Sequence, residues 1–137
     1  MNSASDAGYS GTPLIRKLGF RSGWHVRVSN APKRYDDLLG AGHGVVLDHS
    51  GGQAAYDAAH LFLRDTDGIA TVAMRGIERL KPGGMLWLSW AKKSSALHVG
   101  VTEDALRAAV LPLGWVDVKV CAVDADWSGL KFLRRRR

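Results

Sequence analysis

Apolar and polar positions along the chain follow two spacings, one typical of strands and one typical of helices. The segment WHVRVS at 24–29 alternates apolar and polar residues, and the short apolar runs at 45–48 and 58–63 have strand length. Residues 67–80 place apolar side chains three or four positions apart, which is typical of an amphipathic helix. The segment MLWLSW at 85–90 is apolar at both parities and therefore predicts a strand buried on both faces.

Turn and capping residues predict where the other elements begin and end. Thr12 precedes Pro13, so we expect Thr12 to cap a helix that ends at Gly19. The turn KPGG at 81–84 is expected to end the long helix, and Thr102 is expected to precede another one. The remaining helices and strands are expected at 33–39, 103–111, 115–123 and 129–134.

Strands alternate with helices over most of the chain, which predicts an α/β fold with a doubly wound, mainly parallel sheet. No helix separates the last two strands, so we expect an antiparallel C-terminal strand that closes the sheet as part of a hairpin. The long helix, the turn at 81–84, an apolar strand, a helix and a closing hairpin resemble the second half of class I methyltransferases. This resemblance implies a truncated methyltransferase-like fold.

The composition fits a single folded domain. The chain has 137 residues, of which 46% are hydrophobic and 23% charged, so a disordered chain and a fibrous repeat are excluded. Cys121 is the single cysteine, so no disulfide can form within the chain. We expect a flexible start at 1–8, one Rossmann-like domain at 9–133 and a basic tail at 134–137. The polar start and the absence of a membrane-length apolar run predict a cytoplasmic protein without membrane contact.

Several short segments resemble one particular family. GYSGTPL at 8–14, NAP at 30–32, MLWLSW with two lysines at 85–93, and DVKVCAVD with WSGLKF within 117–132 are similar to a bacterial family of short, uncharacterised proteins classified as a domain of unknown function. The resemblance covers nearly all of 8–133. It implies a small methyltransferase-like Rossmann domain, and it carries over no reaction.

A cofactor site would need particular residues after the first two strands. A methyltransferase places a glycine-rich turn after its first strand and usually a carboxylate at the end of its second, by the logic of dinucleotide sites. Here the first turn contains Asn30 and Pro32 but no glycine, and proline lacks an amide donor. Asp48 stands where a ribose partner would, although it could equally be a turn residue. Asn30 and Asp48 are therefore the candidate residues for S-adenosylmethionine, and the turn argues against that cofactor.

The carboxyl ends of the strands predict a different site. Ligands of doubly wound sheets bind beyond these ends. Two indoles, two ammonium groups and carboxylates would meet there around one crevice suited to an anionic or planar ligand, with 8–11 as a flap. Alternatively, the indoles only cap the core and the lysines are solvated. The expected ligand-rim residues are Trp90, Lys92, Lys93, Asp124, Asp126 and Trp127.

Other chemistry has little support in the sequence. No pair of histidines has the spacing of a helical metal site, and Cys121 lies among apolar residues of a strand, where packing is its expected role. Arg27 is unexpected in a central strand, since an unpaired buried charge is very costly.

Three functional hypotheses follow. The first is a non-catalytic module that binds a small anionic ligand or a protein partner on a degenerate methyltransferase-like scaffold. The second is an atypical S-adenosylmethionine-dependent methyltransferase. The third is a weak nucleic-acid binder that acts through the arginines at 134–137, which hold most of the excess positive charge of the chain.

Overall fold

Six strands form one mixed sheet in the computed structural model, which describes residues 12–136. The strand order is β2-β1-β3-β4-β6-β5. The pairs β2–β1, β1–β3 and β3–β4 are parallel, and β6 is antiparallel to both β4 and β5. The strands are β1 (His25–Ser29), β2 (Val46–Asp48), β3 (Tyr56–Phe62), β4 (Leu80–Ala91), β5 (Trp115–Ala122) and β6 (Trp127–Arg134).

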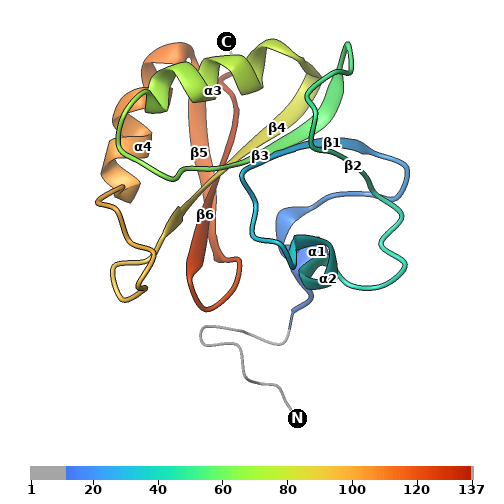
Figure 1. Ribbon diagram of the computed structural model, residues 1–137. Coiled ribbons are helices and arrows are strands. Elements are labelled where there is room, and N and C mark those ends of the chain that lie inside the picture. Colours follow the sequence, from blue (N-terminus) through green and yellow to red (C-terminus); the bar gives the residue numbers. More distant parts are fainter. Residues whose placement is uncertain (1–11, 137) are drawn as a thin grey trace.

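Helices cover both faces of this sheet (Figure 1). The longer helices α3 (Ile69–Glu78) and α4 (Glu103–Val110) lie on one face, and a short 3-10 helix η1 (Leu111–Leu113) follows α4. The five-residue helices α1 (Leu14–Leu18) and α2 (Tyr35–Leu39) lie on the other. The predicted α/β fold, doubly wound and mainly parallel with an antiparallel C-terminal strand, is therefore confirmed.

The connections place a topological switch point between β1 and β3. The chain leaves β1 toward β2 at one edge, and it leaves β3 toward β4 on the opposite side. The return from β2 to β3 has no helix: residues 49–55 alone connect them. In sheets of this kind, the crevice at a switch point is the usual ligand site.

Most predicted elements are present, with local differences at their ends. Thr12 does not cap α1: the residue before the helix is Pro13, and no side chain caps it. Thr102 does cap α4, because its hydroxyl accepts a hydrogen bond from the Ala105 amide at 3.1 Å. The turn at 81–84 belongs to β4, where it forms a bulge. Arg134, which we placed both at the end of the last strand and at the start of the tail, is the last residue of β6.

Arg27 keeps its charge hydrated at the side of the sheet. β1 is the second strand from the edge, beside a β2 of three residues, and the Arg27 side chain is only partly buried. Its guanidinium donates to the Arg75 carbonyl at 3.2 Å, and the loop at 49–55 crosses it at Gly51. Arg79 holds this loop by donating to the carbonyl of Gly51 at 3.2 Å. Partial exposure and the Arg75 carbonyl thus replace the carboxylate partner that a buried arginine would otherwise need.

Each face of the sheet has its own apolar core. The core under α1 and α2 is rich in large aromatic side chains because these short helices leave much of the face to be filled. Its Trp87 indole donates to the carbonyl of Leu18 at 2.9 Å and so fixes α1 to the sheet. Prominent members are Phe20, Tyr35, Phe62, Trp87 and Trp127 on that side and Leu61, Leu86, Leu88, Trp90 and Leu106 on the other.

A polar chain runs through the aromatic core. The His60 ring is fully buried, with Tyr35 Oη 2.7 Å from Nδ1 and Ser89 Oγ 2.7 Å from Nε2. It also stacks on Phe62, with ring centroids 4.4 Å apart. Burial lowers the pKa of His60 to about 3, and burial raises the pKa of Tyr35 well above its usual range. Both side chains are therefore neutral at physiological pH and serve as hydrogen-bonding partners within the core.

We expect the free energy of unfolding to decrease as the pH is lowered below about 6.5. The unfolded chain binds a proton at His60 near that pH, whereas the folded protein does not until about pH 3, so acid favours the unfolded state. The expected loss between about pH 8 and pH 5 is roughly 2 kcal/mol from this residue. Urea unfolding at a series of pH values measures it.

The matched variants are His60→Gln, which should flatten this dependence, and His49→Gln, at an exposed histidine, which should not. NMR of the His60 ring gives an independent measurement in the unmodified protein, since its chemical shifts should stay constant over the same range. A His60 ring that titrates near pH 6 would contradict the assignment.

Candidate functional site

The topological switch point lies between Asn30, after β1, and Arg64, after β3. Asn30 has a left-handed backbone with φ of 58°, and its carbonyl accepts hydrogen bonds from Arg64 Nε at 3.1 Å and Nη2 at 2.6 Å. The Arg64 guanidinium also lies 4.7 Å from the centre of the Trp127 ring, a cation–π distance. Arg64 therefore crosses the carboxyl ends of the strands and connects the β1 turn to β6.

Asp48 serves the return from β2 to β3. Its Oδ1 accepts from the amide of Ser50 at 2.8 Å and from the hydroxyl of Ser50 at 2.6 Å, and its Oδ2 accepts from the hydroxyl of Tyr56 at 2.6 Å. The hydrogen bonds from Ser50 and Tyr56 hold the pKa of Asp48 well below its usual range. Asp48 lies opposite Arg27 in the parallel pair β1–β2. β1 continues for two more residues, to Ser29, before it reaches Asn30. Asn30 and Asp48 are thus held by separate sets of contacts.

The closing hairpin gathers one part of the predicted rim. Asp124 is buried, and its Oδ1 accepts from the amides of Asp126 and Trp127, both at 2.8 Å. Lys92 donates to the carbonyl of Asp124 at 3.0 Å, and Ser95 donates to the carboxylate of Asp126 at 2.8 Å. Lys92, Asp124, Asp126 and Trp127 are therefore close together, but their polar groups mainly hold the hairpin.

Trp90 does not share a crevice with Trp127, contrary to our expectation. Trp127 pairs with Ala91 across the sheet, so Trp90, the residue before Ala91, points to the opposite face. Trp127 packs against Phe62 in the core under α1 and α2, and Trp90 belongs to the core under α3 and α4. The sheet itself separates the two indoles, because alternate residues of a strand face opposite sides.

Trp90 instead lines a small open hollow at the carboxyl end of β4. We call it the Trp90 hollow; its volume is about 230 Å³, and its lining residues are Trp90, Lys93, His98, Val101, Thr102 and Glu103. His98 is held in place by a 3.1 Å contact from Nδ1 to the carbonyl of Ala91. Glu103 is paired with Arg107. Lys93 is exposed, and within 12–136 no hydrogen bond or ion pair of its side chain is recorded. This ammonium group could therefore bind an anion.

Neither the Ser89–His60 pair nor Cys121 is placed for nucleophilic chemistry. Ser89 and His60 are adjacent, but both are fully buried and no substrate could reach them. Burial raises the pKa of the Cys121 thiol, so little of the reactive thiolate forms. No three His, Cys, Asp or Glu side chains of residues 12–136 are arranged to hold a metal ion. Over the same range no helix is long and apolar enough to cross a membrane.

Sequence reasoning missed Arg64, Tyr56 and His98. Arg64 follows directly after a predicted strand, so the rule that ligands bind at carboxyl ends could have identified it. Tyr56 and His98 act through contacts that no spacing along the chain reveals. The flap expected at 8–11 lies outside the described residues.

Comparison with known proteins identifies the fold. No family model matches the chain, and no curated protein matches it. Among solved structures, TrmN from Thermus thermophilus aligns with a TM-score of 0.56 and 11% identity over 88% of this chain and 47% of that one. This chain thus spans about half the length of TrmN.

Two further structures hold S-adenosylhomocysteine. A SAM-dependent methyltransferase from Geobacter sulfurreducens aligns with a TM-score of 0.54 and 13% identity over 90% of this chain and 92% of its own. The 1,6-didemethyltoxoflavin-N1-methyltransferase of Burkholderia thailandensis aligns with a TM-score of 0.53 and 14% identity over 90% of this chain and 75% of its own. The fold is therefore a truncated methyltransferase-like α/β fold, and at these identities the likeness concerns the fold alone.

Substitution of Asp124 should destabilise the protein because it leaves buried donors unpaired. Asp124→Ala removes the acceptor of two amides, and we expect the free energy of unfolding to fall by about 1–3 kcal/mol. Asp124→Asn keeps an acceptor oxygen and should lose less. Asp65→Ala is the matched control, because Asp65 accepts from the Asp67 amide in an exposed turn where water can replace it. Equal losses for Asp124→Ala and Asp65→Ala in urea unfolding would contradict this role.

Proposed function

We propose that this protein is a non-catalytic binding module on a methyltransferase-like scaffold, and that it binds a small anionic ligand in the Trp90 hollow. The observation that carries the first part is the position of Arg64, whose guanidinium binds the Asn30 carbonyl and lies over the Trp127 ring at the switch point. The second part is supported by the combination of an indole, an exposed ammonium group and an imidazole in one hollow.

The residues at the switch point do not fit S-adenosylmethionine. A cofactor carboxylate or ribose at this edge needs free backbone amides and a free side-chain carboxylate. The turn after β1 has no glycine, and Pro32 lacks an amide. Arg64 already occupies the Asn30 carbonyl, and both oxygens of Asp48 already accept hydrogen bonds. Binding would have to break these contacts before forming its own.

The Trp90 hollow suits a small anion better than a large ligand. Its volume of about 230 Å³ is below the usual range for drug-sized ligands. Lys93 supplies the cation of the hollow, while Nδ1 of His98 is used to donate to the Ala91 carbonyl, so His98 shapes the hollow rather than adding a donor. A protein partner with an acidic side chain could place its carboxylate at the same position, and it would be revealed by the same substitutions.

The alternatives have weaker support. An atypical S-adenosylmethionine-dependent methyltransferase is favoured by the neighbours that bind S-adenosylhomocysteine, but not by the contacts of Arg64 and Asp48. A weak nucleic-acid binder would use 134–137, yet Arg134 ends β6, and the Arg135 amide donates to the Gly114 carbonyl at 2.8 Å. Membership of the family of short bacterial proteins stays a prediction, as does a cytoplasmic location.

The test of the first part is binding of S-adenosylhomocysteine. A ligand at about 100 times its dissociation constant should add roughly 2.7 kcal/mol to the stability of the folded state. We therefore expect no rise in melting temperature at millimolar S-adenosylhomocysteine. A clear rise for the unmodified protein would overturn the proposal. Arg64→Ser removes the guanidinium, and binding gained in this variant alone would identify Arg64 as the group that excludes the cofactor.

The test of the second part is an NMR titration with inorganic phosphate and adenosine monophosphate. We expect the indole N–H of Trp90 and the ring of His98 to shift, and Lys93→Gln to weaken the effect about tenfold. Lys33→Gln removes the same charge at another exposed position and should leave the binding of both probes unchanged. The site is refuted if neither probe shifts these signals, or if both substitutions weaken binding equally.

A further inference from the structure

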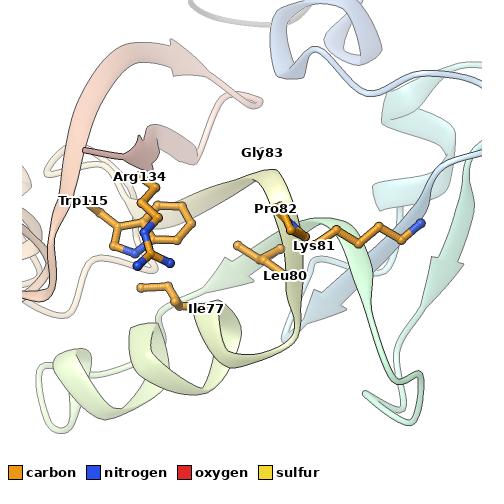
Figure 2. A pocket seen from close by; sticks show the side chains of 7 residues that line it. All are labelled: Ile77, Leu80, Lys81, Pro82, Gly83, Trp115 and Arg134. Atoms are coloured by element: carbon orange, nitrogen blue, oxygen red, sulfur yellow. The ribbon is translucent and has the colours of Figure 1, made fainter. Parts of the chain in front are cut away.

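A second cavity lies at the opposite end of the sheet from the Trp90 hollow. Here β4 and β5 begin and β6 ends. Figure 2 shows it between the end of α3, the start of β4 and the last pair of β5 and β6. Its volume is about 380 Å³, within the usual range for small-molecule sites. Ile77, Leu80 and Trp115 form apolar walls, the turn at 81–83 forms a rim, and Arg134 supplies a charged group. We call it the amino-end cavity.

The geometry of three elements creates this cavity. Trp115 and Arg134 are partners across the antiparallel pair β5–β6, so their side chains emerge on the same face of the sheet. Leu80 pairs with Tyr56 of β3, but the next pair joins Met85 to Ala58, so the turn at 81–84 stands away from the sheet as a bulge. The bulge leaves space beside the Trp115–Arg134 pair, and Ile77 from α3 closes one side.

The two cations at the cavity differ in their partners. Lys81 pairs with Asp57 at 3.2 Å, and its side chain extends away from the cavity in Figure 2. Arg134 lines the same cavity as Trp115 and Ile77, and it is the cross-strand partner of Trp115. Arg134 is exposed, and within 12–136 no hydrogen bond or ion pair of its side chain is recorded. An arginine next to apolar walls can bind a planar carboxylate through two parallel hydrogen bonds.

We propose that the amino-end cavity binds a small aromatic or branched aliphatic carboxylate. Its carboxylate pairs with the guanidinium of Arg134, and its apolar part packs against Ile77 and Leu80, beside the small part of Trp115 that is exposed. A monoanion fits better than a phosphate dianion, because the second cation, Lys81, is already paired. Stacking of a nucleobase on Trp115 is not expected, since that side chain is only 5% exposed. This site is independent of the one proposed at the Trp90 hollow.

NMR titration with phenylacetate and 3-methylbutanoate tests the proposal, with phenylacetamide as the uncharged analogue. We expect the indole N–H of Trp115 and the amide of Gly83 to shift with the carboxylates, and phenylacetamide to bind at least about tenfold more weakly. Arg134→Gln should lower the affinity for phenylacetate by about tenfold or more. Arg134→Lys keeps the charge but cannot form two parallel hydrogen bonds to a carboxylate, so its effect should be intermediate.

Arg136→Gln is the matched control, because it removes the same charge from an exposed arginine that does not line the cavity. It should leave the affinity for phenylacetate unchanged, as should Lys93→Gln at the other site. Three results would overturn the proposal: no shift of Trp115 or Gly83 at about 20 mM of either carboxylate, equal binding of phenylacetamide, or an equal loss of affinity in Arg136→Gln and Arg134→Gln.

Discussion

The short loop that connects β2 to β3 constrains the half of the molecule that contains β1, β2 and β3. Residues 49–55 must bring the chain from the carboxyl end of one parallel strand to the amino end of another without a helix. Asp48 closes this return through Ser50 and Tyr56, and Arg79 holds it through the Gly51 carbonyl. The same loop covers Arg27, so a strand that carries a charge can lie next to the edge of the sheet. The Asp48 carboxylate at the end of β2 therefore has a structural role: it holds this loop.

The polar groups at the carboxyl edge of the sheet mainly bind other groups of the fold. The neighbours with this fold include structures that hold S-adenosylhomocysteine. In this chain the groups at the corresponding edge bind one another: Arg64 binds the Asn30 carbonyl, and Asp124 binds the hairpin amides. Fold and activity are separable because the sheet depends on backbone pairing and apolar packing, whereas a site depends on polar groups that remain free.

Aromatic side chains compensate for the small helices on one face. Helices α1 and α2 have five residues each, too few to cover four parallel strands alone. The space is filled by Phe20, Tyr35, Phe62, Trp87 and Trp127, with His60 as a neutral ring among them. The hydrogen bonds between His60 and Tyr35 and between His60 and Ser89 satisfy polar atoms that would otherwise be costly to bury. On the other face, the longer helices α3 and α4 allow a mainly aliphatic core.

The sequence by itself determined the α/β class, the strand buried on both faces and the closing antiparallel hairpin, because these follow from local spacing and from turn residues. It also predicted a helix start at Thr102, whose hydroxyl lies within one turn of the Ala105 amide that donates to it. Only the tertiary structure decided which polar residues stay free. Trp90 and Trp127 are separated by the sheet, Asp48 is bound by Tyr56, and Arg134 faces a cavity, since strand register and pairing fix the side on which each residue emerges.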